Sequence, residues 1–205
     1  MEMTMTRFLA ALSILAFTLT AHAADIKPAL INTFGHEGGF QADPHDSGNY
    51  AHGVLKGTKF GIAAASYPSE DIRNLTIERA AVLYDRDFWG ASRCGEWKSQ
   101  IIAQDYFDAA VNLGQGTAAR ILQRAINYAG YPMPRIAVDG RIGPATVRRL
   151  NSVDQAALYV HMIGLIHNRY VQIVDANARK ERYLKTWAYR VKGNVQRSVA
   201  AYERR

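Results

Sequence analysis

The chain has 205 residues, of which 48% are apolar and 21% charged, and its formal net charge is +7. A chain of this composition can bury a core. Its single cysteine excludes an internal disulfide and any zinc site built on several thiolates. The positive charge suits polyanions such as cell-wall polymers, outer-membrane headgroups or nucleic acid, although a merely soluble basic surface would have the same charge.

Residues 1–23 have the pattern of a secretory signal peptide. Arg7 supplies a positive charge, an apolar stretch covers residues 8–19, and residues 21–23 (Ala-His-Ala) fit the cleavage rule. The apolar stretch is shorter than the roughly 20 residues that span a bilayer. We therefore expect an exported protein, periplasmic or secreted, that begins at Ala24 and is not stably inserted in a membrane. An uncleaved signal anchor is the alternative.

Most of the remaining chain shows the apolar spacing of amphipathic helices, which predicts a mainly α fold. Thr76 is expected to cap the second helix, and Glu37 to close the first. The expected helices, in chain order, cover residues 29–37, 76–88, 102–113, 117–129, 144–150, 158–174 and 181–202.

The segment 38–61 breaks this helical pattern. Six of its 24 residues are glycine, and most of the others are polar. No helix tolerates that composition, so we expect an irregular loop or a small β-hairpin held against the helical body. Long structured loops on a rigid scaffold are where functional residues concentrate.

Glu37 lies at the junction between the first helix and this loop, between Phe34 and Phe40. The helix dipole disfavours a negative charge at a helix C-terminus, and the flanking rings can desolvate the carboxylate. Both effects predict a raised pKa for Glu37. A carboxylic acid that stays protonated near neutral pH can protonate the leaving oxygen when a glycosidic bond is cleaved. An ordinary glutamate before a glycine cap would have the same local sequence.

A second carboxylate would complete such a site. Asp46 is our candidate and Asp43 the competing choice, while Thr58 could orient a water molecule from the far side of the loop.

The three histidines at positions 36, 45 and 52 could suggest a metal site. The sequence contains no His-Glu-x-x-His spacing, and zinc needs a defined set of three or four ligands. We expect neither a metal nor another cofactor.

Four motifs follow one another along the chain: HEGGFQADPHD at 36–46, LKGTKFGI at 55–62, FDAAVNLG at 107–114 and VDGRIGPAT at 138–146. The first three resemble glycoside hydrolase family 108, which contains lysozyme-like N-acetylmuramidases of bacteria and phages. The fourth resembles the peptidoglycan-binding half that is usually fused to this family.

The resemblance implies a lysozyme-like helical fold in which the loop or hairpin carries part of the active site. It implies a hydrolase domain over 24–113 and a helical peptidoglycan-binding region over 114–205. Glu37 matches the catalytic glutamate and Asp46 the second acidic position. Thr58 matches the family's threonine only if the residues just before it form a loop extension.

The implied reaction is hydrolysis of the β-1,4 bond between N-acetylmuramic acid and N-acetylglucosamine in peptidoglycan glycan strands. Tyr50, Phe60 and Asn112 are the candidate substrate-binding residues, and no nucleic-acid partner is expected. The alternatives are a non-catalytic peptidoglycan-binding or secretion-assisting protein, a lytic transglycosylase that also uses Glu37, and a zinc peptidase or amidase. Cys94 is expected to be a bystander, with a reactive or dimer-forming thiol as the alternative.

Overall fold

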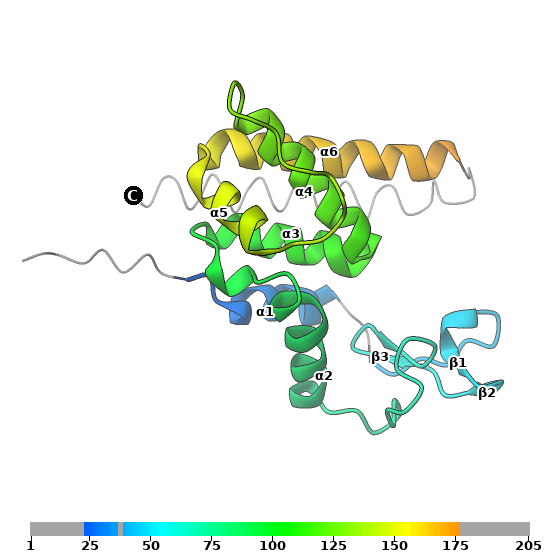
Figure 1. Cartoon of the computed structure of the whole chain (residues 1–205). Coiled ribbons are helices and arrows are strands. Elements are labelled where there is room, and N and C mark those ends of the chain that lie inside the picture. Colours follow the sequence, from blue (N-terminus) through cyan, green and yellow to red (C-terminus); the bar gives the residue numbers. More distant parts are fainter. Residues whose placement is uncertain (1–22, 37–38, 177–205) are drawn as a thin grey trace, which may run out of the picture.

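The computed structural model describes residues 23–36 and 39–176, and these ranges are mainly helical (Figure 1). This confirms the predicted fold class, mainly α with a small hairpin region. The α-helices are α1 (Ile26–His36), α2 (Ile77–Tyr84), α3 (Gln100–Leu113), α4 (Gln115–Ala129), α5 (Pro144–Ser152) and α6 (Gln155–Asp175). The strands are β1 (Tyr50–Ala51), β2 (Val54–Leu55), β3 (Thr58–Lys59) and β4 (Ile62–Ala63). Short helical turns are η1 (Ser47–Asn49), the π-helical η2 (Asp85–Gly90) and η3 (Cys94–Glu96).

Local capping explains where two of the predicted helices begin. Thr76 caps α2 as expected, because its hydroxyl accepts a hydrogen bond of 3.2 Å from the amide of Arg79. The longest helix, α6, begins at Gln155, ahead of its apolar stripe. Its start is set by the carboxylate of Asp154, which accepts a hydrogen bond of 2.7 Å from the amide of Ala157.

The second predicted helix differs at its end. It was expected to reach Phe88, but α2 stops at Tyr84 and the chain continues in the π-helical η2. Trp89 in this turn is buried, with its ring centroid 5.9 Å from that of Phe107. Trp89 is therefore part of the hydrophobic core.

Gly114 makes the bend between α3 and α4. Its φ of +83° is a conformation that favours glycine, and α4 begins at the next residue, two positions earlier than predicted. Three other expectations lie outside the described residues: the signal peptide up to residue 22, the position of Glu37, and the last helix over 181–202. The described part of the first helix, α1, ends at His36.

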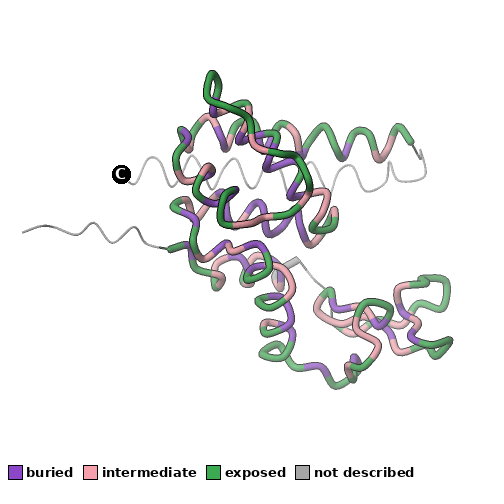
Figure 2. The backbone as a smooth tube through the Cα atoms, in the orientation of Figure 1, coloured by how far each residue is buried: buried purple, intermediate pink, exposed green. Residues whose placement is uncertain are grey.

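The hydrophobic core lies mainly in the helical body, and Ile62, Ile72 and Leu75 from the segment before α2 extend it. The α3 helix packs against α1 and α4, and α6 packs against α4 (Figure 1). Figure 2 shows buried residues in each of these helices, and most residues of α3 are buried. Among the largest side chains that are fully buried are those of Trp97, Tyr106, Phe107, Leu122 and Ile126.

Cys94 belongs to this core. Its side chain is completely buried, and burial raises the pKa of its thiol. A buried and protonated thiol is neither nucleophilic nor accessible to a second chain. The structure therefore supports the bystander role and contradicts the reactive or dimer-forming alternative.

The segment between α1 and α2 extends away from the helical body as a separate lobe (Figure 1). We call its described residues, 39–75, the β-lobe. Most of them are exposed or half-buried (Figure 2). No helix within the described ranges is both long enough and apolar enough to cross a membrane.

Two tight hairpins form the centre of the β-lobe. In the first, Tyr50 pairs with Leu55 and the turn is His52-Gly53. In the second, Thr58 pairs with Ala63 and the turn is Phe60-Gly61. All four turn residues have positive φ, as the type I′ turns of two-residue hairpins require. The hairpin expected from the glycine-rich composition is thus present, and it occurs twice.

Candidate active site

Asn49 is the centre of a hydrogen-bond network inside the β-lobe. Its side chain is completely buried. The amide oxygen accepts hydrogen bonds from the Thr58 hydroxyl at 2.8 Å and from the Gln41 amide at 3.1 Å. The amide nitrogen donates to the side-chain oxygen of Gln41 and to the carbonyl of Asp43, both at 2.9 Å. A buried amide with these partners fixes their relative positions, because breaking any of the bonds leaves a buried polar group unpaired.

The backbone of Asn49 extends the same network. Its carbonyl accepts hydrogen bonds from the amides of Lys56 and Gly57, at 2.8 and 2.9 Å. Gln41 and Thr58 also form an antiparallel bridge, with backbone bonds of 2.9 and 2.8 Å. The residues around position 41 are thereby joined to both hairpins.

Neither Asn49 nor Gln41 was identified from the sequence. Their importance lies in bonds between side chains eight and nine residues apart, and such pairs have no sequence signature within a glycine-rich loop.

Thr58, a predicted catalytic residue, lies at the start of β3 and is half-buried. Its hydroxyl proton is committed to Asn49, so only the oxygen lone pairs remain available to a ligand. The hydroxyl can therefore accept a hydrogen bond from a water molecule, which is the interaction that positions such a water. This is compatible with the predicted role and narrows it to that of an acceptor.

Asp46, the predicted second carboxylate, is exposed. It caps η1, and one carboxylate oxygen accepts a hydrogen bond of 2.9 Å from the amide of Gly48. The competing choice, Asp43, is also exposed and makes a similar local bond of 2.8 Å with the amide of His45. Each carboxylate keeps lone pairs for solvent or substrate, so the geometry does not rank one above the other.

Two of the three predicted substrate-binding residues also stabilise the lobe. The Tyr50 hydroxyl donates a hydrogen bond of 3.1 Å to the carbonyl of Pro44. Phe60 lies in the second hairpin turn, and its carbonyl accepts a hydrogen bond of 3.0 Å from Tyr84 at the end of α2. The third, Asn112, is exposed on the last turn of α3, where its amide donates to the carbonyl of Asp108 at 2.7 Å.

Aromatic packing connects Phe60 to the helix that precedes Glu37. The ring of Phe34, in the last turns of α1, meets the ring of Phe60 edge-on, with centroids 6.0 Å apart. Phe34 also packs against Tyr84 at 5.9 Å. The structure thus brings together the end of α1 and the second hairpin. Glu37 itself, three residues after Phe34, lies outside the described residues.

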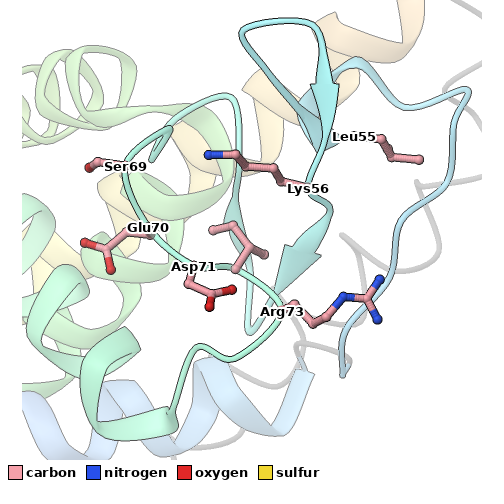
Figure 3. Close-up of a pocket in the computed structure, with 7 residues that line it drawn as sticks. Leu55, Lys56, Ser69, Glu70, Asp71 and Arg73 are labelled. Carbon is pink, nitrogen blue, oxygen red and sulfur yellow. The ribbon is translucent and has the colours of Figure 1, made fainter.

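A hollow of about 400 Å³ opens on the β-lobe between the end of β2 and the loop that leads to α2 (Figure 3). The ammonium group of Lys56 joins the two sides by donating a hydrogen bond of 2.7 Å to the carbonyl of Pro68. The lining residues are Leu55, Lys56, Ser69, Glu70, Asp71, Ile72 and Arg73, none of which was predicted as a site residue.

The two carboxylates of this hollow are unsuited to donating a proton. Glu70 forms an ion pair with Arg79 at 2.6 Å, and that hydrogen bond lowers the pKa of the carboxyl group. Hydrogen bonds from Asn74 lower the pKa of Asp71. Both groups stay ionised near neutral pH, so the hollow can offer acceptors to sugar hydroxyls but no general acid. Within the described ranges, no three His, Cys, Asp or Glu side chains gather as a metal site would need.

Comparison with known proteins divides the chain into two parts. Residues 30–114 match the family model of glycosyl hydrolase 108, and residues 117–192 match the model of a predicted peptidoglycan domain. Among solved structures, SagA of Brucella abortus is similar with a TM-score of 0.65, at 19% sequence identity. The similarity covers 84% of this chain and 92% of SagA, and at that identity it concerns the fold alone. No curated protein sequence matches the chain.

Proposed function

We propose that this chain, a glycosyl hydrolase 108 domain followed by a predicted peptidoglycan domain, is an exported muramidase. It would hydrolyse the β-1,4 bond between N-acetylmuramic acid and N-acetylglucosamine. The observation that carries the proposal is that these two domains occur together in one chain. The peptidoglycan domain indicates which polymer the chain binds. The hydrolase domain indicates that the bond cleaved in this polymer is glycosidic.

Glu37 is the proposed general acid. In sequence it follows α1 directly, at the entry to the β-lobe. Cleavage of a glycosidic bond needs a proton on the leaving oxygen, and general acid catalysis of this kind contributes about 10²–10⁴-fold to the rate. Among the described carboxylates near the β-lobe, Glu70 and Asp71 have lowered pKa values and cannot take this role.

Thr58 and Asp46 are the proposed partners of Glu37. The Thr58 oxygen accepts a hydrogen bond from the attacking water, while Asn49 holds the hydroxyl in place. Asp46 supplies an exposed negative charge that removes the water's proton or stabilises the positive charge that develops on the sugar. The ring of Phe60 and the amide of Asn112 are the proposed contacts with the glycan.

The deciding experiment is digestion of purified sacculi by the full chain, followed by mass spectrometry of the released fragments. A muramidase leaves reducing N-acetylmuramic acid ends. A lytic transglycosylase leaves 1,6-anhydro ends instead, and an amidase leaves peptides free of sugar.

The matched variant is Glu37→Gln, which keeps the size of the side chain and removes its acid. We expect sacculus binding to persist and fragment release to fall at least about 100-fold. A Glu37→Gln protein as active as its parent would contradict the mechanism. A parent protein that binds sacculi and releases nothing would support a non-catalytic wall-binding function instead.

A further inference from the structure

A groove of about 480 Å³ runs between α4 and α6, in the part of the chain that matches the predicted peptidoglycan domain. Four residues of each helix line it, at the spacing i, i+3, i+4 and i+7 that marks one helix face. They are Thr117, Arg120, Ile121 and Arg124 on α4, and Leu165, Asn168, Arg169 and Gln172 on α6.

The lining of this groove is basic and polar over a small apolar base. Ile121 is buried and Leu165 half-buried, so these two belong to the contact between the helices. Three arginines contribute positive charge, and no carboxylate is found among the eight lining residues.

Within the part of the chain that the structure describes, two of the three arginines have no partner that would neutralise them. Arg124 and Arg169 are exposed and form no hydrogen bond or ion pair with the described part of the chain. Arg120 is held in place, since its guanidinium donates to the carbonyl of Gly116 at 3.1 Å and lies against Gly140. By contrast, Arg79, Arg86 and Arg93 each pair with a carboxylate. Gathering unpaired like charges is unfavourable, and an anionic ligand offsets the repulsion.

We propose that this groove binds the carboxylates of peptidoglycan stem peptides. The inference rests on the proposed function only in taking peptidoglycan as the polymer. Where a stem peptide is attached, the sugars carry no charge, because the lactyl carboxyl is bound to the peptide as an amide, whereas the peptides carry free carboxylates. Guanidinium groups bind carboxylates through paired hydrogen bonds, and a volume of this size suits a short peptide.

The polar residues of the groove fit the rest of a peptide. Asn168 and Gln172 each present an amide with both donors and an acceptor, and Thr117 presents a hydroxyl. These groups match the alternating amide and carbonyl groups of a peptide backbone. A division of labour follows, in which the first domain takes the glycan and the α4–α6 groove takes the peptide.

The test compares two ligands and two double variants of the full chain. The ligands are the disaccharide-tetrapeptide from digested sacculi and the same disaccharide without peptide, with its lactyl carboxyl group amidated so that it carries no charge. The groove variant is Arg124→Gln/Arg169→Gln. The matched control is Arg135→Gln/Arg148→Gln, which removes two exposed arginines of the same domain that do not line the groove. Both variants lower the net charge equally, and circular dichroism checks that both fold.

We expect the parent to bind the disaccharide-tetrapeptide in preference to the bare disaccharide. The Kd for the disaccharide-tetrapeptide should rise about tenfold in the groove variant and less than about twofold in the control. The expected rise is modest because pairs of exposed charges contribute little binding energy. Equal weakening by both variants, or equal binding of both ligands by the parent, would overturn the proposal. Polyphosphate and lipopolysaccharide are added as competitors, and groove-dependent binding of either in preference to the peptide ligand would also overturn the proposal.

Failure of this inference can be told apart from failure of the proposed function. If the parent releases no fragments from sacculi but the groove variant still loses binding, the peptide site stands and the muramidase activity does not. If the parent releases fragments and the groove variant binds as the control does, the activity stands and the peptide site does not.

Discussion

The hydroxyl of Thr58 donates a hydrogen bond of 2.8 Å to the side-chain oxygen of Asn49, a residue that solvent does not reach. This contact orients Thr58 and leaves its lone pairs as the only part of the hydroxyl that a ligand can use. The proposed catalytic threonine is therefore held by the same amide that joins the two hairpins of the β-lobe.

Replacing Thr58 by valine or by serine separates these two roles. Thr58→Val keeps the shape of the side chain but removes the hydroxyl, so we expect hydrolysis of sacculi to fall by about 10²-fold. The free energy of unfolding should fall by about 1–2 kcal/mol, because the buried oxygen of Asn49 loses a partner. Thr58→Ser keeps the donor and the acceptor, and it should retain most of the activity. Equal activity of the valine and serine variants would remove Thr58 from the mechanism.

Asp46 caps the helical turn η1, and its negative charge is proposed to act in catalysis. Two substitutions distinguish these roles. Asp46→Asn keeps an oxygen that can accept from the amide of Gly48 and removes the charge. We expect it to lower the rate while leaving the melting temperature nearly unchanged. Asp46→Ala should lower both, with a loss of stability of about 0.5–1 kcal/mol. Asp43→Asn is the companion variant, and a larger rate loss there than in Asp46→Asn would assign the second carboxylate to Asp43.

Gly57 and Gly53 offer a matched test of how tightly the β-lobe is packed. Both have positive φ, +87° and +78°. A Cβ at Gly57 would lie 2.5 Å from the carbonyl oxygen of Gln41 and 2.7 Å from the ring of Phe40, whereas a Cβ at Gly53 meets no atom within 4 Å. In urea denaturation, Gly53→Ala should lower the free energy of unfolding by about 1 kcal/mol, because the only cost is the strain of a positive φ. Gly57→Ala should cost about 3 kcal/mol, because backbone must move as well. Similar losses for the two variants would contradict the close approach at Gly57.

The raised pKa of Tyr67 predicts that the folded protein loses stability at high pH. Burial, together with a hydrogen bond of 2.9 Å to Asp87 and the charge of that carboxylate, raises the pKa of Tyr67 to about 12. Since the pKa in the unfolded chain is about 10, the contribution is complete below pH 10 and is lost as the pH rises from about 10 to 12.

The measurement is the unfolding free energy of the parent relative to Tyr67→Phe, at several pH values in that window. The difference should shrink as the pH rises. Tyr131→Phe, which removes an exposed hydroxyl, serves as the control and should show no such trend relative to the parent. A constant difference for Tyr67→Phe would mean that its hydroxyl titrates as in the unfolded chain.

The helical part of the fold was predictable because an amphipathic helix repeats its apolar residues over several turns, as in α3 and α6. The hairpins were only partly predictable. Strands of two residues are too short to show alternation, and only the pairs His52-Gly53 and Phe60-Gly61 carry a turn signal. The π-helical η2 has no local sequence signal that we recognised.

The candidate site also has a part that was predictable from the sequence and a part that was not. Thr58 was identified through a motif that is contiguous in sequence. Asn49 was missed because its bonds join side chains eight and nine residues apart, which only the fold brings together. The α4–α6 groove was missed for a related reason, since each helix supplies half of it and neither half is unusual alone.

The β-lobe combines the hydrogen bonds around Asn49 with a few buried apolar side chains, among them Ile62 and Ile72, whereas α3 lies at the centre of the hydrophobic core. Segments with few buried apolar contacts open at a lower free energy than core helices do. On heating, the lobe can therefore open as one cooperative unit while the helical body stays folded. Loss of the proposed hydrolase activity on heating would then precede the melting of the helices.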